Sequence, residues 1–236
     1  MSKFADLHVL PRVDDLNSTR RMAELLHLAG FSTIALSIPT GLMRDRMLEV
    51  RRLFEDEGIE TILRVDLSVN TRTDLLRLLR RFRNAFDLVA VKCMNQTVAS
   101  VACRDRRVDV VFFDPRNFRV NFVHPLASLL SGALEFNLIS TFLGEAKSEI
   151  FFRVAKEAAI AREHRSKVIL SSGCMSPAMV RSPLQIAAIA TAIGLSSDQS
   201  RRGVQETPIS IVMSNQERRS REYVEEGVKL VTPKAR

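Results

Sequence analysis

Short β-branched or aromatic runs alternate with helical patterns along the chain, and the joins between them constrain the fold most. One helical pattern ends at Gly30, and the strand-like run Thr33–Ser37 follows. A second, from about 42 to 57, is stopped by Gly58, and the run Ile59–Val65 begins at once. Glycine ends helices because it tolerates a left-handed backbone. Two successive helix–Gly–strand joins predict a parallel βα repeat.

The same alternation continues toward the C-terminus and gives about seven predicted strands. Neither G-x-G-x-x-G nor G-x-x-x-x-G-K-[ST] occurs, and the chain has only nine glycines, which disfavours an open nucleotide-binding sheet. We therefore expect an α/β fold, a TIM-barrel-like (β/α) barrel or a distorted relative. The predicted strands are Phe4–Val9, Thr33–Ser37, Ile59–Val65, Asp87–Lys92, Val108–Phe113, Leu134–Ile139 and Val168–Ser171.

Helix starts are marked by capping residues. Asn17 or Ser18 can cap the first helix, and Thr71 opens a pattern that resembles a capping box. After the last predicted strand, Ser182 and Ser196 each begin a capping box with Gln three residues later. These closely spaced starts predict a C-terminal helical cluster.

No linker rich in Gly, Ser or Pro interrupts the chain, so one domain is the economical interpretation. We expect that domain to span residues 1–214. From Asn215 the sequence becomes polar and charged, which predicts a peripheral helix and tail over residues 215–236.

The chain shows no feature of a secreted or membrane protein. No run of about 18 uncharged apolar residues occurs, and Asp6 lies where a secretory peptide would be apolar. The three cysteines are odd in number and form no C-x-x-C pair, so neither a disulfide framework nor a thiolate zinc site is expected. We expect a cytoplasmic protein.

The charge balance indicates a polyanionic partner. Lys and Arg number 35 against 27 acidic residues, which gives a net charge of +8 and a pI near 10.0. The span from Arg64 to Arg119 holds twelve basic and six acidic residues, and so most of the excess. Nucleic acid is the commonest polyanion in a cell. A basic surface that merely faces solvent is the alternative at this point.

Asp6 and His8, at the end of the first predicted strand, are the most suggestive catalytic candidates. Residues two apart in a strand share a face, and strand ends form the usual active-site mouth of a barrel. A metal-dependent phosphoesterase using Asp6 and His8 is therefore one hypothesis. A hydrolytic metal site needs at least three protein ligands, however, and the chain has only four histidines. A structural role for both residues is the favoured interpretation.

Two further catalytic possibilities are weaker. Lys92 could be a desolvated Schiff-base lysine, but a cation at the barrel mouth is the simpler reading. Ser171 and Ser172 precede Gly173 without an assignable histidine and carboxylate partner, which favours turn-forming serines. No catalytic residue is therefore assigned to the chain.

Taken in order, six segments resemble the ribonuclease P protein component 3 family of archaea over roughly residues 3 to 205. No single motif is decisive, but the ordered set is specific. The segments are Phe4–Leu7, Asp87–Lys92, Arg107–Val111, Leu134–Asn137, Val168–Gly173, and Val180–Pro183 followed by Gly194–Ser196.

The resemblance implies a TIM-barrel-like subunit related to the polymerase-and-histidinol-phosphatase (PHP) fold, without that superfamily's metal cluster. Asp6-Leu7-His8 matches the start of the superfamily's D-x-H-x-H motif, but Leu10 replaces the second histidine. The resemblance also implies that the chain binds no cofactor itself and that the RNA of the holoenzyme uses Mg²⁺ to remove the 5′ leader of precursor tRNA.

The implied partners are ribonuclease P RNA, precursor tRNA indirectly, component 2 in a heterotetramer, and other protein subunits. Lys92 and Arg181 match basic positions of the family pattern, and charge clustering adds six further candidates. The predicted RNA-binding residues are Arg64, Lys92, Arg104, Arg106, Arg107, Arg116, Arg119 and Arg181.

Overall fold

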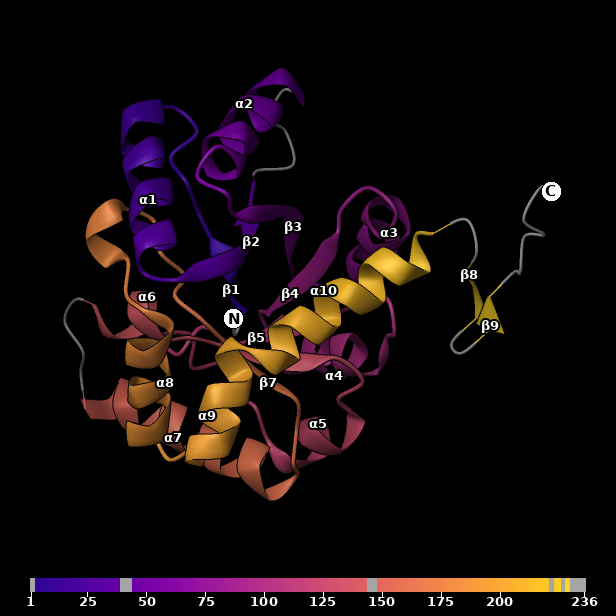
Figure 1. The fold of residues 1–236 in the computed structure, drawn as a ribbon. Coiled ribbons are helices and arrows are strands. Elements are labelled where there is room, and N and C mark those ends of the chain that lie inside the picture. Colours follow the sequence, from indigo (N-terminus) through magenta and orange to yellow (C-terminus); the bar gives the residue numbers. More distant parts are fainter. Residues whose placement is uncertain (1–2, 39–43, 144–147, 221–222, 226–227, 230–236) are drawn as a thin grey trace.

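The computed structural model describes residues 3–38, 44–143, 148–220, 223–225 and 228–229. Seven strands form one parallel sheet in which each strand pairs with the next in sequence (Figure 1). This confirms the parallel βα repeat and the number of strands expected. The strands are β1 (Phe4–Val9), β2 (Phe31–Ser37), β3 (Glu60–Val69), β4 (Leu88–Cys93), β5 (Val110–Phe112), β6 (Ala133–Asn137) and β7 (Val168–Ser171).

Helices surround the strands, as Figure 1 shows, and two more short strands, β8 (Tyr223–Glu225) and β9 (Val228–Lys229), pair near the C-terminus. No helix in the described ranges is both long and apolar enough to cross a membrane. The helices are α1 (Leu16–Leu28), α2 (Arg44–Glu55), α3 (Arg72–Phe82), α4 (Gln96–Arg104), α5 (His124–Leu129), α6 (Leu138–Phe142), α7 (Ser148–Glu163), η1 (Pro177–Met179), α8 (Pro183–Ala192), α9 (Ser197–Val204) and α10 (Glu206–Arg218).

The predicted helix starts are confirmed at three places. Thr71 caps α3 by accepting from the Asp74 backbone N–H, and complete capping boxes begin α8 at Ser182 and α9 at Ser196. The expected cap of α1 was wrong. Asp15 fills that position because its carboxylate accepts from the backbone N–H of Ser18 at 2.9 Å.

The strand expected over 134–139 is shorter than predicted. β6 ends at Asn137, and the chain turns directly into the short helix α6. An apolar run such as Leu138-Ile139 is compatible with either structure, so periodicity alone could not locate this boundary.

The barrel is nearly closed between β7 and β1. One isolated parallel bridge joins Val9 of β1 to Cys174, three residues beyond β7, and the backbone N–H of Leu10 donates to the Cys174 carbonyl at 2.9 Å. A seam with so few backbone hydrogen bonds needs side chains to pair its remaining polar groups.

Two apolar layers stabilise the fold. The larger layer lies between the strands and the surrounding helices, and the smaller one fills the barrel interior with small residues such as Ala5, Ala35 and Ala90. Val212 of α10 packs into the interior layer, and Figure 1 shows α10 crossing the strands at that end. Helix α10 therefore covers the N-terminal end of the barrel.

Helix α10 also runs across the expected boundary between residues 214 and 215. Asn215 is buried, where it donates to the Asp87 carbonyl at 3.1 Å and accepts from Arg83 at 2.9 Å. Arg219 adds an ion pair with Asp87 and a 2.8 Å bond to the Phe86 carbonyl. These contacts attach the end of α10 to the turn before β4.

Candidate functional site

A buried guanidinium lies at the centre of the barrel, toward the carboxyl ends of the strands. Arg64 of β3 is fully buried, and its two terminal nitrogens donate to both carboxylate oxygens of Glu135 on β6, at 2.7 and 2.6 Å. Its Nε donates to Asp66 at 2.9 Å, and Nη1 also donates to the Leu7 carbonyl at 2.6 Å. The Phe112 ring lies 5.4 Å from Cζ. Two carboxylates, a carbonyl and a ring face thus surround this cation.

Strand alternation explains why these groups meet. Ile62 belongs to the interior apolar layer, whereas Val65 and Leu67 pack against the helices. Positions 62, 64 and 66 of β3 therefore face the interior, because side chains alternate along a strand. The carboxylate of Glu135 lies opposite on β6 and completes the pair.

His8 joins the same network. Its Nδ1 lies 2.8 Å from the Asn137 Oδ1 and 3.3 Å from Glu135, and its Nε2 lies 3.4 Å from Asp66. Burial and Arg64 both oppose protonation, but Glu135 and Asp66 outweigh them and raise the pKa of His8 to about 9. The ring is therefore an imidazolium near neutral pH.

The two cations hold the two carboxylates ionised. Burial alone would raise the pKa of Glu135, but Arg64 and His8 lower it to about 2. Asp66 is likewise opposed by burial, and the same two cations keep its pKa well below the usual range. Two positive and two negative charges make this interior network neutral.

Asp6 belongs to the seam rather than to that network. Its buried carboxylate accepts from the backbone N–H of Ser172 at 3.2 Å and from that of His8 at 3.1 Å. Burial is the largest influence and raises the pKa of Asp6 to about 6. The carboxylate thus bridges β1 and the end of β7 where the backbone ladder is interrupted.

Asp6 and His8 do not converge on one point. The register of β1 shifts between Asp6 and Val9, which interrupts the regular alternation assumed from sequence. The His8 ring therefore meets Asp66 and Glu135, while the Asp6 carboxylate faces Ser172. Neither Asp6 nor His8 belongs to a group of three potential metal ligands whose ligand atoms all lie within 4.8 Å of one another. In the described residues, such a group occurs at His124, Glu163 and His164.

A pocket of about 370 Å³ opens above the network at the barrel mouth. His8, Asp66 and Phe112 line the pocket on the side of the network, and Lys92 and Arg116 add two cations to the lining. The Lys92 Nζ is 3.0 Å from Asp114 and the Arg116 guanidinium donates to the Thr141 carbonyl at 3.2 Å.

The loop that carries Arg116 and Arg119 is tied to α7. Arg153 donates to the carbonyls of Pro115, Asn117 and Val120, and its guanidinium stacks over the Phe118 ring at 5.5 Å. Buried Glu157 accepts from the Phe122 backbone N–H at 3.2 Å. Arg153 and Glu157, which pair with each other at 3.5 Å on α7, therefore hold this side of the mouth in place.

The predicted RNA-binding residues separate to opposite ends of the barrel. Four of them lie on the mouth side, since Lys92 is the penultimate residue of β4 while Arg116 and Arg119 follow β5 and Arg181 follows β7. Residues 104–107 connect α4 to β5 and therefore lie at the opposite end. Nearness in sequence did not mean nearness in space.

Arg64 must be removed from the predicted set. Its side chain is fully buried and its donors are taken by Glu135, Asp66 and Leu7, so no polynucleotide phosphate can reach it. Arg107 is half-buried and paired with Asp105 at 2.6 Å. Arg104 and Arg106, by contrast, are exposed.

Sequence reasoning missed several residues at both ends. Glu135 and Asn137 were not singled out, although a carboxylate inside the apolar run of β6 is itself a signal of a buried partner. Lys167 and Arg218 line a groove of about 390 Å³ with Arg106 at the α10 end. No local pattern could have joined these three, because α4, β7 and α10 bring them together only in the folded chain.

The fold and the interior network define a TIM-like parallel barrel protein whose strand-end carboxylates are neutralised by a guanidinium and an imidazolium. Comparison with known proteins agrees with that class. A putative prolidase from Bifidobacterium longum superposes with a TM-score of 0.65 at 9% identity, over 91% of this chain and 70% of the other. A dihydroorotase from Campylobacter jejuni superposes with a TM-score of 0.54 at 12% identity, over 89% of this chain and 83% of the other, and the expected α/β barrel fold is confirmed.

The family model for RNase P subunit p30 matches residues 3–220, and the chain belongs to this family of ribonuclease P protein subunits. Ribonuclease P protein component 3 of Methanococcoides burtonii is 26% identical over 239 residues, covering 98% of this chain and 95% of that protein. A chain in a cryo-EM structure of archaeal ribonuclease P with mature tRNA has a TM-score of 0.81 at 16% identity, covering 98% of this chain and 100% of the other. The family resemblance predicted from sequence is confirmed.

Proposed function

We propose that this chain is a non-catalytic subunit that binds and stabilises the catalytic RNA of ribonuclease P while the holoenzyme removes the 5′ leader of precursor tRNA. The RNA performs the hydrolysis with Mg²⁺, and the chain itself holds no cofactor. One observation carries the non-catalytic role: the Arg64 guanidinium is bonded to Glu135 and Asp66 at the strand ends. Barrel enzymes place their reacting groups at this end, whereas here the carboxylates at this end are already bonded to Arg64.

The electrostatics of the network support this role. A divalent metal at the same place would need the carboxylates of Glu135 and Asp66, and Arg64 already neutralises them. To bind a metal, His8 would have to release a proton that Glu135 and Asp66 favour. The network therefore contributes to stability and shape, and the remaining basic residues outside it are available to a polyanion.

RNA binding rests on exposed cations at both ends of the barrel. At the α10 end, Arg104 and Arg106 are exposed and have no carboxylate partner among the residues that the structure describes, and Lys167 and Arg218 line the groove beside Arg106. At the mouth, Arg116 and Arg119 are exposed on the loop held by Arg153. Lys92 lines the mouth pocket beside Arg116, and Arg181 follows β7 on the same end of the barrel. Guanidinium groups suit phosphate contacts through paired hydrogen bonds.

We also propose that the chain acts within a larger assembly, as does its structural neighbour in archaeal ribonuclease P. Component 2 is the expected protein partner in a heterotetramer, with precursor tRNA contacted indirectly through the assembled RNA. Neutralising about six phosphates should give a log–log salt slope of roughly −4 to −5 for RNA binding. The salt slope distinguishes a subunit that binds RNA phosphates from one that contacts only other proteins.

The test compares three double charge reversals in the full chain with ribonuclease P RNA. Arg104→Glu/Arg106→Glu alters the α10 end and Arg116→Glu/Arg119→Glu the mouth. Arg20→Glu/Arg52→Glu is the matched control, because both residues are exposed on the outer helices α1 and α2.

Each interface variant should flatten the salt slope by about 1.5 to 2 and reduce reconstituted pre-tRNA cleavage, because two phosphate contacts are lost. The control should change the slope by less than about 0.5. An equal effect of the control would show non-specific charge attraction, and unchanged slopes in both interface variants would place the RNA elsewhere. Chelator-sensitive phosphoester hydrolysis by the purified chain, abolished by His8→Ala, would overturn the non-catalytic role.

A further inference from the structure

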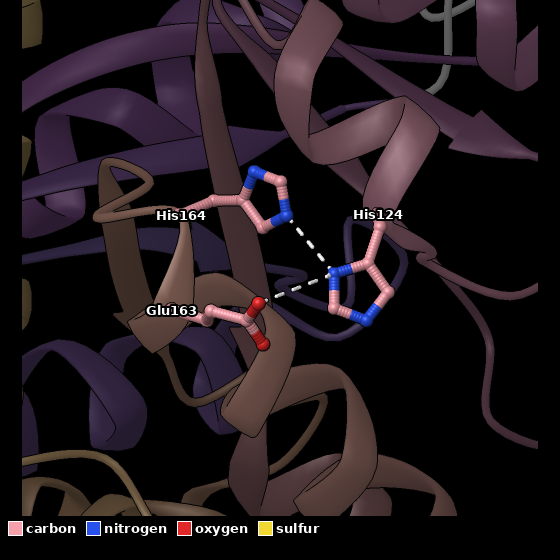
Figure 2. A group of neighbouring side chains, drawn as sticks. All are labelled: His124, Glu163 and His164. Atoms are coloured by element: carbon pink, nitrogen blue, oxygen red, sulfur yellow. Dashed lines mark hydrogen bonds and ion pairs between the residues drawn. The ribbon is translucent and has the colours of Figure 1, made fainter.

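Three side chains of metal-ligating types meet at the ends of α5 and α7, and none of them is among the residues proposed above to bind RNA. His124 begins α5, while Glu163 and His164 stand at the end of α7. Figure 2 shows the two imidazole rings and the carboxylate turned toward one another. The His124 Nδ1 lies 3.0 Å from the His164 Nε2 and 3.9 Å from a Glu163 carboxylate oxygen.

These separations are close to those of a tetrahedral metal site. Zinc–nitrogen bonds of about 2.0–2.1 Å and zinc–oxygen bonds of about 2.0–2.2 Å put neighbouring ligand atoms roughly 3.3–3.4 Å apart. The two observed separations, 3.0 and 3.9 Å, lie on either side of that value. Small rotations of the exposed His124 and Glu163 side chains would bring both separations to the tetrahedral value.

A neighbouring hydroxyl orients one of the rings. The Ser128 Oγ donates to the His124 carbonyl at 3.1 Å and lies 3.5 Å from the His164 Nδ1. Because that hydroxyl proton is used, the oxygen can accept from an Nδ1–H of His164. This leaves the lone pair of the His164 Nε2 directed at His124 and Glu163. A hydrogen bond from the nitrogen that does not bind the metal fixes the tautomer of a metal-bound histidine.

The position in the fold also favours a cation. Glu163 is the last residue of α7, a sixteen-residue helix, and the carbonyl end of a helix dipole attracts positive charge. A metal there would join α5 to α7 across forty residues of chain.

We propose that His124, Glu163 and His164 bind one divalent transition-metal ion, Zn²⁺ in the first instance, with the fourth position open to water. Two imidazoles and one carboxylate are ligands that zinc prefers, whereas Mg²⁺ prefers oxygen. When the metal binds, the Nδ1 proton of His124 is replaced and the ring carries its proton on the solvent-facing Nε2 instead. The site does not depend on the RNA-binding role proposed above.

The test is equilibrium dialysis of the full chain against Zn²⁺ in the presence of excess Mg²⁺. We expect about one equivalent bound with a Kd on the order of 10 µM, weaker than closed four-ligand zinc sites. His124→Ala and His164→Ala should each weaken binding at least tenfold, and Glu163→Gln should weaken it less. His27→Ala is the matched control, because His27 is exposed on α1 and should leave binding unchanged.

A second readout identifies the coordination. Co²⁺ substituted for Zn²⁺ should give the visible spectrum of a tetrahedral site in the wild type and in His27→Ala, and lose it in His124→Ala. Circular dichroism of each variant establishes that it is folded. Zinc binding that survives in the His124→Ala/His164→Ala double variant, or a wild type that binds no Zn²⁺ at 100 µM, would overturn the proposal and leave these side chains an ordinary hydrogen-bonded group.

Discussion

Removal of the buried guanidinium is the sharpest test of how this barrel is stabilised. In Arg64→Met the side chain keeps a similar length but loses the donors to Glu135, Asp66 and the Leu7 carbonyl. His8 then stands as the only cation of the network beside two carboxylates. One buried negative charge is left uncompensated, and breaking a buried pair in this way costs about 3–5 kcal/mol.

The pKa of Glu135 gives an independent magnitude. A fall from 4.5 to about 2 on folding corresponds to about 3 kcal/mol of stability. Because this folded pKa is depressed, the contribution is present above pH 4.5 and is lost as the pH falls toward 2. In Arg64→Met, burial becomes the dominant influence and raises the pKa of Glu135 above 4.5. The variant should therefore lose stability as the pH rises, the opposite dependence.

Urea denaturation between pH 5 and pH 8 measures both effects. Arg64→Met should be about 3–5 kcal/mol less stable than the wild type at pH 7.5, with a smaller difference at pH 5. The double variant Arg64→Met/Glu135→Leu should recover at least 2 kcal/mol of the loss, because His8 and Asp66 then balance each other. A loss below about 1 kcal/mol, a pH-independent loss, or a double variant no better than the single would refute this account.

Two further predictions concern other parts of the fold. Burial raises the pKa of Glu157 to about 7, so the contribution of this group to stability is greatest below pH 4.5 and falls by up to about 3 kcal/mol as the pH rises through 7. Glu157→Gln should flatten this decline in urea denaturation, and an unchanged decline would contradict the assignment. At Gly132 an added Cβ would lie 2.5 Å from the Asp109 carbonyl oxygen and 2.9 Å from that of Val108. Backbone atoms cannot move aside, so Gly132→Ala should lower the free energy of unfolding by about 1–3 kcal/mol, and a loss below about 0.5 kcal/mol would show that the strand yields.

The barrel could be predicted because its strands and helix starts are encoded locally. β1 and β7 have the limits expected from their β-branched and aromatic residues, and the Ser182 and Ser196 caps have the expected partners. β5 is shorter than the run 108–113 suggested, since Val108 and Asp109 instead precede the strand. Local chemistry predicts that an element exists better than it predicts the residues at which the element begins and ends.

The site could be predicted only in part because it depends on which face and which end each residue occupies. Arg64 stands between Leu63 and Val65, and sequence alone did not show that the even positions of β3 face the interior. The register shift in β1 separated Asp6 from His8, a change that no periodicity reveals. The position that each residue takes in the folded barrel, rather than its residue type, decided whether these site predictions were right.

Because the interior network is neutral, the electrostatic field that a polyanion meets comes from the charges outside it. Arg64 and His8 are balanced by Glu135 and Asp66, so the network adds nothing to the field outside the barrel. The excess of positive charge in the chain therefore resides outside that network. Exposed charges interact over roughly 8–10 Å at physiological salt, so the mouth loop and the α10 groove act as separate contacts rather than one field. A polyanion that uses both must span the barrel from end to end, which a large folded RNA can do and a short acidic peptide cannot.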